Sequence, residues 1–262
     1  MSRVRERKIF DCDSCRYQFS VLAGTIFHDT HLPLPIWFAT TYVMCESRKG
    51  VSANQIKRMM GIGYKAAWYL CHRIRASMAM AEAERQPLGG VVEVDETYVG
   101  GKPRRGASKR GRGTEKESVI GIRQRGGDLR FFHAQDVKSG TLAKYIKENI
   151  SQDVDVVMTD DFSVYPKAIA KAGVLGEHKA INHSLGVYSI GDLHTKTVES
   201  AFSLLKRGII GTWHRVSAKH LQAYLDEMSF RFDNRKNPYL FRDTIKRMLD
   251  SDNLEFKQLV AA

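Results

Sequence analysis

The sequence predicts an α/β protein, with a small helical region ahead of a domain in which strands and helices alternate. Two patterns indicate this class. Apolar residues recur at helical spacing before about residue 86, and short Val- and Ile-rich segments alternate with helical ones after it. The chain has 262 residues, of which 43% are hydrophobic, so it can bury a sizeable core. We therefore divide it into four parts, which are residues 1–31, 32–86, 87–240 and 241–262.

The chain is strongly basic. Lys and Arg number 41 against 29 Asp and Glu, a formal net charge of +12. This surplus suggests a polyanionic partner, with nucleic acid first and an anionic membrane surface second. A solvated positive face without a partner is the plainer alternative. No apolar run reaches the length of a membrane span, and the charged N-terminus lacks a signal-peptide core, so we expect a cytoplasmic protein.

The first part contains a close cysteine pair, Cys12 and Cys15. Without a secretory signal, such a pair favours a zinc knuckle over a disulfide. With His28 and His31, the pair nearly fits a Cys₂His₂ finger, but the two histidines are one residue closer than the usual lower limit. The other cysteines, Cys45 and Cys71, lie on apolar helical faces and are expected in the core.

The second part reads as three helices. The first opens at Pro35 and stops near Arg48. Ser52 can cap a short second helix that Gly61 closes, and a third runs from Tyr64 to about Glu84.

The second and third of these helices form a helix-turn-helix pattern, because a short Gly-containing turn joins them. Its basic surface favours DNA contact, and the alternative is a plain helical hairpin with solvated charges. The residues expected to contact DNA here are Lys57, Arg58, Lys65, Arg73 and Arg75, with His72 beside them.

The third part begins after Pro87 and has the alternating character of an α/β domain. Ser139 is expected to cap a helix, and Gly126-Gly127 to make a hairpin turn. The predicted strands are 91–100, 118–125, 128–137, 153–161 and 178–182, and the predicted helices are 140–150, 164–172, 197–210 and 217–232.

A basic segment, residues 102–116, interrupts this domain. It contains seven Lys or Arg residues and no apolar periodicity, which indicates a mobile loop. We interpret it as a clamp on the DNA backbone, since phosphate contacts need only flexible cations; a merely solvated insertion is the alternative. The cations concerned are Lys102, Arg104, Arg105, Lys109, Arg110 and Arg112.

Acidic residues end two of the predicted strands. Asp95-Glu96 follows VVEV and Asp160-Asp161 follows VVMT, while Glu199 lies in the first turn of a predicted helix. Carboxylates fixed at strand ends suit Mg²⁺ or Mn²⁺, and three meeting at one rim would hold two ions for phosphodiester chemistry. Each acid alone is more often structural, and the helix dipole by itself favours a Glu at this position.

Lys206 follows Glu199 by seven residues, which is two helical turns. Both side chains therefore share one face of the predicted helix. A cation beside the acid could bind the phosphate that is cut, or a neighbouring one.

Several of these segments resemble one family. VEVDETYVGGKPRR, GRGTEK, VMTDDFSVY and HTKTVESAFSLLKRGIIGTWHRVSAKHLQAYLDEMSFRFDNR are similar to the catalytic domain of ISXO-type insertion-sequence transposases, which are bacterial DDE enzymes. The upstream CDSCRYQFSVLAGTIFHDT and SANQIKRMMGIGYKAAWYLCHRIR are similar to their N-terminal zinc ribbon and helices. The resemblance covers nearly the whole chain.

The resemblance implies an RNase H-like fold with a triad of Asp95, Asp160 and Glu199, and with Lys206 as the basic partner. Asp161 is the rival of Asp160, and the family's spacing from Asp to Tyr165 favours Asp160. Many members have Asn where this chain has Lys196, which leaves Glu199 as the metal ligand of that segment.

The resemblance also bears on the cysteines. In the family the first zinc knuckle comes earlier and the segment with His28 ligates nothing, so the chain is expected to begin inside a zinc ribbon, of which Cys12 and Cys15 are the remaining knuckle.

The expected function is that of a DNA transposase, which cuts at the ends of its element and joins them to target DNA. The resemblance implies that it binds terminal inverted repeats and target DNA, acts as a homo-oligomer, and works in the cytoplasm at the bacterial nucleoid. Two alternatives remain open. One is a metal-dependent nuclease of the same fold without strand transfer, and the other is an inactive or relic DNA-binding protein.

Overall fold

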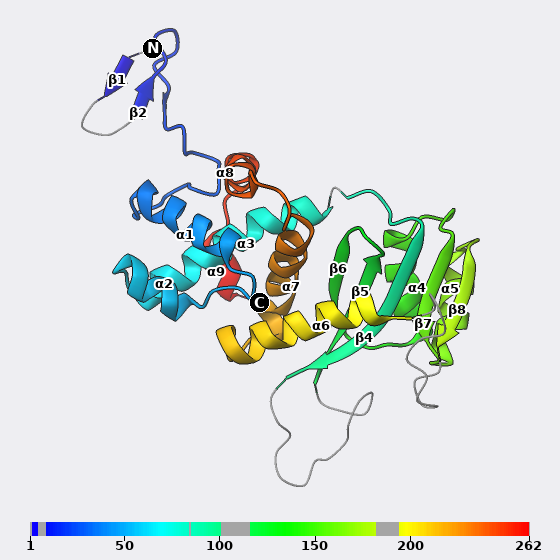
Figure 1. Ribbon diagram of the computed structural model, residues 1–262. Helices are drawn as coiled ribbons and strands as arrows, with labels where there is room; N and C mark the ends of the chain where they lie inside the picture. Colours follow the sequence, from blue (N-terminus) through cyan, green and yellow to red (C-terminus); the bar gives the residue numbers. More distant parts are fainter. Residues whose placement is uncertain (1, 5–8, 84, 101–115, 182–193, 262) are drawn as a thin grey trace.

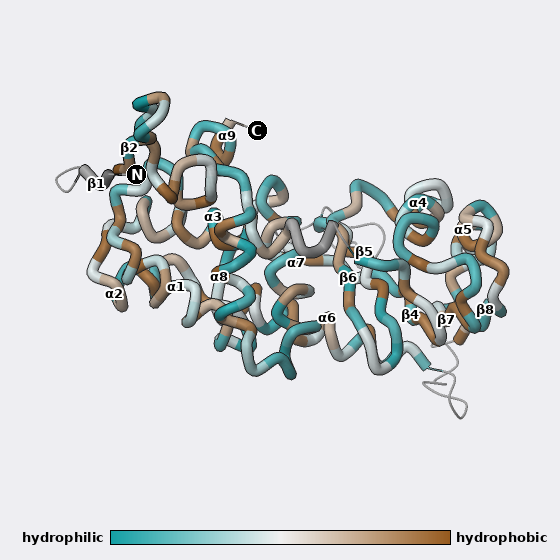
Figure 2. The backbone as a smooth tube through the Cα atoms, turned by 90° about the horizontal axis from the view of Figure 1, so that it is seen from above, coloured by the Kyte–Doolittle hydropathy of each residue, from teal (hydrophilic) through white to brown (hydrophobic). Residues whose placement is uncertain are grey.

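A computed structural model describes residues 2–4, 9–83, 85–100, 116–181 and 194–261 of the chain. A five-stranded sheet with its helices forms one end of the molecule, and a group of helices forms the other (Figure 1). Helices α6 (Lys196–Gly208) and α7 (Ala218–Asp233) lie between these two parts in both Figure 1 and Figure 2.

The sheet is mixed, with strand order β6-β5-β4-β7-β8. The central strand β4 pairs antiparallel with β5 and parallel with β7; β5 also pairs antiparallel with β6, and β7 pairs parallel with β8. The α/β class is therefore confirmed, and this sheet agrees with an RNase H-like fold. The strands are β4 (Val91–Val99), β5 (Glu117–Gln124), β6 (Leu129–Ala134), β7 (Val156–Asp160) and β8 (Glu177–Ile181).

The two faces of the sheet carry different helices, because successive residues of a strand point to opposite sides. Val92 and Val94 of β4 pack in one core with α4 (Ser139–Asn149) and α5 (Val164–Ala172). Val99 of β4 packs in another core with α6 and α7. The odd-numbered residues of β4, Asp95 among them, therefore face α6.

Helix α6 approaches the sheet closely at Gly121, the β5 residue that pairs with Asp95. A Cβ atom at this position would lie 2.7 Å from Cζ of Phe202 and 2.9 Å from Cγ2 of Val198. These separations are far below ordinary van der Waals contact. Only glycine therefore lets α6 lie at this distance from β4 and β5.

The helical region forms a separate core. Ile56, Leu70 and Ile74 are buried in it with Leu240 and Met248 of the C-terminal part, so the residues after 240 share the core of the helical region. The predicted burial of Cys45 and Cys71 is confirmed. The helices are α1 (Leu34–Glu46), α2 (Ala53–Met60), α3 (Tyr64–Ala83), α8 (Leu240–Asp250) and α9 (Phe256–Val260).

Helix ends test two of the predicted caps. The Ser52 hydroxyl accepts a hydrogen bond from the Gln55 N–H, so it caps α2 as predicted. The prediction that Ser139 caps α4 is wrong. Ser139 is already the first helical residue, and Lys138 precedes it without a side-chain cap. The turn is held instead by Asp136, whose Oδ1 accepts from the Lys138 N–H and the Thr141 hydroxyl.

Three short strands precede the helices. β1 (Ser2–Val4), β2 (Ile9–Asp11) and β3 (Gln18–Phe19) form an antiparallel sheet at the far end of the helical region (Figure 1).

After α6, a π-helical turn (Ile209–Trp213) leads toward α7. Among the described residues, no helix has both the length and the apolar character needed to cross a membrane.

Candidate active site

Two neighbouring parallel strands bring the predicted acids together. Asp95 lies on β4, and Asp160 is the last residue of β7. The ladder between these strands runs from Val91–Val156 to Glu93–Met158, so both acids lie just beyond its last pair. One ligand oxygen each from Asp95, Glu96 and Asp160 lies within 4.8 Å of the others, and all three residues are half-buried. We call these three residues the carboxylate cluster.

The electrostatics of the cluster suit a cation. Burial raises the pKa of Asp95 well above its ordinary value, and the charges of Glu96, Asp160 and Glu199 raise it further. A hydrogen bond of 2.8 Å from the Glu96 N–H to Asp95 Oδ1 opposes this rise in pKa. Hard carboxylate oxygens that repel one another are the donor set that Mg²⁺ and Mn²⁺ prefer, so the residues present fit a divalent metal.

Glu199 lies in the first turn of α6, as predicted. Its charge acts on Asp95, but its carboxylate is not a member of the carboxylate cluster. Its Oε1 instead accepts a hydrogen bond of 2.9 Å from the Thr195 hydroxyl. Lys206 is exposed two turns further along the same helix.

Glu96 joins the cluster without having been predicted as a ligand. Its Oε2 accepts a hydrogen bond of 2.6 Å from the hydroxyl of Tyr165, a fully buried residue of α5. Consecutive residues of a strand point to opposite faces, so the sequence gives no reason to group Glu96 with Asp95. Of the two rival acids, Asp160 at the end of β7 lies in the cluster, whereas Asp161, the residue after β7, is exposed and outside it.

Another acid, Glu93, is fully buried on β4 and ties α6 to the sheet. Its Oε2 accepts hydrogen bonds from the N–H groups of Thr197 and Val198, both 3.0 Å, and from the Thr197 hydroxyl at 2.7 Å. Its Oε1 accepts from Arg125 Nε at 2.8 Å and lies 3.3 Å from His194 Nδ1. Sequence reasoning missed Glu93, although a charged residue inside an otherwise apolar strand is the signal that marks it.

The basic residues of the helix-turn-helix pattern divide into two groups. Lys57, Arg58 and Lys65 are exposed on α2 and the first turn of α3. Arg75 is 1% exposed, and its Nε lies 2.6 Å from Glu227 Oε2 of α7. The prediction that Arg75 contacts DNA is therefore wrong, because its charge is already neutralised inside the protein.

The prediction of DNA contact is also wrong for Arg73. This residue is 3% exposed, and its Nη2 donates 2.8 Å hydrogen bonds to the carbonyl of His28 and to Oδ1 of Asn253. Arg73 therefore joins the segment before α1 to the C-terminal segment.

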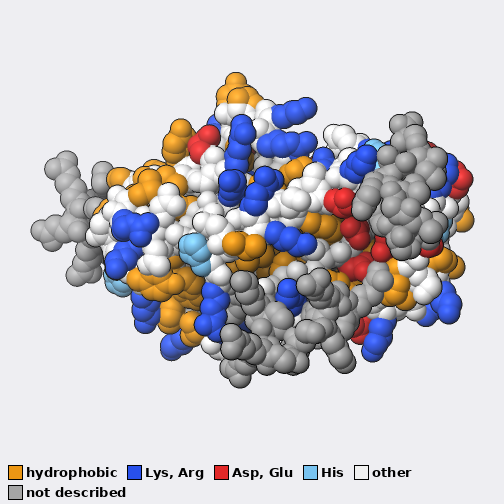
Figure 3. All heavy atoms as spheres, turned by 60° about the horizontal axis from the view of Figure 1, so that its bottom comes forward, with side chains coloured by type: hydrophobic (Ala, Val, Ile, Leu, Met, Phe, Trp, Pro, Cys, Tyr) orange, Lys and Arg blue, Asp and Glu red, His pale blue; other side chains and the backbone are white. Residues whose placement is uncertain are grey.

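One face of the molecule carries side chains of both signs of charge. In Figure 3, Asp and Glu side chains gather toward the sheet end of the face shown, and Lys and Arg side chains lie between them and the helical region. The six cations of the predicted basic clamp, Lys102, Arg104, Arg105, Lys109, Arg110 and Arg112, lie outside the described residues.

The cysteine pair lies at the turn between β2 and β3. The Cys12 N–H donates to the Tyr17 carbonyl, and the Arg16 N–H donates to the Cys12 carbonyl. Hydrogen bonds from Cys15 lower the pKa of Cys12, which favours a thiolate. Among the residues that the structure describes, neither His28 nor His31 forms a group of three metal-ligand atoms with the cysteines. Zinc at Cys12 and Cys15 stays a prediction.

An α/β domain with clustered carboxylates beside basic side chains is typical of metal-dependent enzymes that act on nucleic acids. Comparison with known families gives the particular class. The model of the ISXO2-like transposase domain matches residues 87–233, which is more than half of the chain. The chain therefore belongs to the ISXO2-like transposase family.

A curated relative agrees with this assignment. The chain is 28% identical over 263 residues to an uncharacterized protein in transposable element ISH50 of Halobacterium salinarum (strain ATCC 700922 / JCM 11081 / NRC-1). The match covers 95% of this chain and 85% of that protein. The resemblance to insertion-sequence transposases is thus confirmed.

Solved structures with some similarity include two complexes of Mos1. The Mos1 strand transfer complex is 10% identical, with a TM-score of 0.34 over 83% of this chain and 78% of that one. The mariner Mos1 paired end complex with Mg is 12% identical, with a TM-score of 0.28 over 87% and 82% of the two chains. Similarity at this level does not extend to individual residues.

Proposed function

We propose that the protein is a DDE transposase, which cuts DNA at the ends of its element and joins those ends to target DNA. The carboxylate cluster carries this proposal, because it lies just beyond the paired part of two neighbouring parallel strands, β4 and β7, in a transposase domain. Asp95 and Asp160 would hold divalent metal ions, with Glu199 as the third carboxylate. When bound, Mg²⁺ or Mn²⁺ would activate a water or a 3′-hydroxyl and stabilise the leaving oxygen.

The chain's own residues would orient the DNA for this reaction. Lys206 is exposed two turns from Glu199 and would bind a phosphate near the cut. Lys57, Arg58 and Lys65 would contact the backbone of the terminal repeats from the helix-turn-helix, and the basic segment 102–116 would hold it from the catalytic domain. No side chain needs to become covalently attached to DNA, because the released 3′-hydroxyl is itself the nucleophile.

This proposal has consequences for assembly and location. Joining two element ends to one target requires both ends in a single complex, so we propose at least a dimer on DNA. Because the substrate is chromosomal DNA, we place the protein in the cytoplasm at the nucleoid.

A strand-transfer assay tests the proposal. The full chain is incubated with a pre-cut duplex of the element end, which carries a free 3′-hydroxyl, and with a target plasmid. We expect joined products with Mg²⁺ or Mn²⁺ and none with a chelator. Cutting of an uncut end without any joining would instead identify a nuclease. Binding without either reaction would identify a relic DNA-binding protein, and both results would contradict the proposal.

A further inference from the structure

The N-terminus of α6 is capped from within the sheet. The first N–H groups of a helix have no partner inside the helix, and an N-cap side chain usually accepts from one of them. Thr195 precedes α6 but makes no such bond. The buried carboxylate of Glu93 accepts from two of these groups instead, those of Thr197 and Val198. Because a charged acceptor makes stronger hydrogen bonds than a hydroxyl, this is a firm attachment of α6 to β4.

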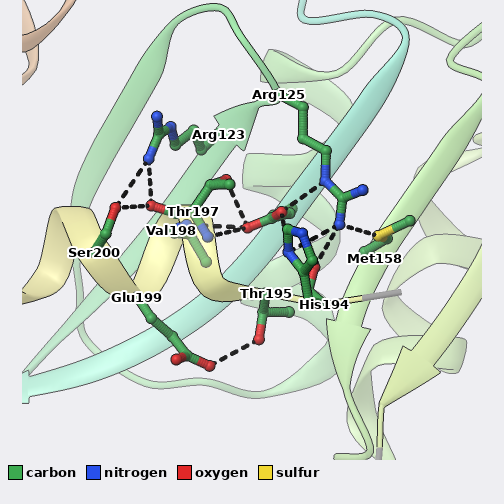
Figure 4. Close-up of polar contacts among 10 residues, drawn as sticks. Arg123, Arg125, Met158, His194, Thr195, Thr197, Val198, Glu199 and Ser200 are labelled. Atoms are coloured by element: carbon green, nitrogen blue, oxygen red, sulfur yellow. Dashed lines mark hydrogen bonds and ion pairs between the residues drawn. The ribbon is translucent and has the colours of Figure 1, made fainter. Parts of the chain in front are cut away.

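This arrangement gives the Thr195 hydroxyl another role. It donates to Oε1 of Glu199 one turn further along the helix, at 2.9 Å (Figure 4). Glu93 thus accepts the hydrogen bonds that an N-cap side chain would ordinarily accept. Thr195, which occupies the N-cap position, instead orients Glu199, the proposed third carboxylate. Thr195 is fully buried, which limits the directions in which its hydroxyl can point.

Oε1 of Glu93 connects this attachment, through Arg125, to β7, the strand that carries Asp160. Arg125 donates from Nε to Glu93 at 2.8 Å. Its Nη2 donates at 3.0 Å to the sulfur of Met158, two residues before Asp160, and at 2.8 Å to the His194 carbonyl just before α6. One buried carboxylate therefore links β4, β7 and the start of α6, the three elements that carry Asp95, Asp160 and Glu199.

The distance of α6 from the sheet is fixed as well. Gly121 lets Val198 and Phe202 lie against β5, as described above. On the other side of the first turn, Arg123 of β5 donates to the Thr197 carbonyl and, at 3.2 Å, to the Ser200 hydroxyl. The first turn of α6 is thus held through both its N–H and its C=O groups, so little freedom remains for the backbone of Glu199.

We propose that Glu93 is a positioning residue for metal binding: it caps α6 from the sheet, and with Thr195 it holds Glu199 in place beside Asp95. This inference rests on the proposed function, since it takes Glu199 to be the third metal-binding carboxylate. Glu93 acts only through Glu199 and is not a metal ligand itself.

The first test replaces Glu93 with Gln in the full chain. The amide keeps the size of the side chain but loses the charge that Thr197, Val198 and Arg125 share. Loss of a residue that orients a metal ligand typically weakens metal affinity or activity by about 10- to 100-fold. We expect a loss of that size both in Mn²⁺ affinity, measured by calorimetry without DNA, and in the cleavage rate at subsaturating Mn²⁺. Binding of the element end should stay within about twofold of the wild type.

A second pair of variants does not touch Glu93. Thr195→Val keeps the shape of the side chain but removes the hydroxyl bonded to Glu199, whereas Thr195→Ser restores the hydroxyl. We expect the valine variant to lose Mn²⁺ affinity in the same direction as Glu93→Gln and the serine variant to recover most of it. Ser203→Ala is the matched control, because Ser203 is an exposed serine of the same helix that takes no part in the contacts described above for the first turn of α6. It should bind Mn²⁺ like the wild type.

The outcomes separate this inference from the proposed function. If the wild type binds Mn²⁺ and cuts DNA while Glu93→Gln and Thr195→Val match it in both, the positioning role is refuted and the proposed function stands. If the wild type neither binds Mn²⁺ nor cuts the element end, the proposed function itself fails. If Thr195→Ser is as weak as Thr195→Val, the hydroxyl is not what holds Glu199, and the inference is overturned.

Discussion

Replacing Asp95 with Asn is expected to reduce metal-dependent cleavage of the element end by about a thousandfold or more, with DNA binding retained. The substitution keeps the volume of the side chain and removes one charge from the carboxylate cluster. Burial and the charges of its acidic neighbours raise the pKa of Asp95, so a bound cation favours its ionised form. Cleavage is measured on a labelled duplex, and DNA binding by gel shift.

Asp161→Asn is the control for this variant. Asp161 adjoins Asp160 in sequence but is exposed and outside the carboxylate cluster. Its replacement should change cleavage by less than about threefold, in keeping with the small effects of surface substitutions. Equal losses from both variants would show that net charge, rather than a metal site, controls the reaction.

Replacing Glu227 with Ala is expected to lower the free energy of unfolding by about 3–5 kcal/mol. Glu227 is fully buried on α7. Its two oxygens lie 2.6 Å from Arg75 Nε of α3 and 3.1 Å from Arg231 Nε of α7. Without Glu227, two buried guanidinium groups would lose their counter-charge where α3 of the helical region packs on α7. Urea denaturation followed by circular dichroism measures the change.

An exposed ion pair provides the comparison. Glu177 and Lys179 of β8 are 2.8 Å apart, but both remain accessible to solvent. Glu177→Ala should change the free energy of unfolding by no more than about 1 kcal/mol, because water already screens the pair. The interpretation of Glu227 is wrong if Glu227→Ala is destabilised no more than this control.

Much of the fold follows from local patterns in the sequence. The observed bounds of β4, α3 and α5 fall within about one residue of the predicted segments, because these elements have clear apolar periodicity and good end signals. Ser52 caps α2 as expected since its partner is only three residues away. Asp136 could not be predicted to replace Ser139, because both lie near the start of the helix and both are good acceptors.

Only part of the active site could be predicted from the sequence. Asp95 and Asp160 could be paired because each follows a run of apolar strand residues, although β4 itself continues past Asp95 to Val99. The predictions for Arg73 and Arg75 are wrong because helical spacing does not reveal what packs against each face of a helix. Arg75 is neutralised by Glu227, a residue 152 positions away in the chain. The cap that Glu93 provides for α6 spans 104 or more positions, so no local motif could identify it.

A crystal structure of the full chain with Mn²⁺ and an element-end duplex tests the central claim most directly. Anomalous scattering would locate each ion. We predict a peak about 2 Å from oxygens of Asp95 and Asp160, with Glu199 completing the protein ligands and Glu96 still bonded to Tyr165. A peak held by Glu96 in place of Glu199, or no peak at the carboxylate cluster, would contradict this account of the active site.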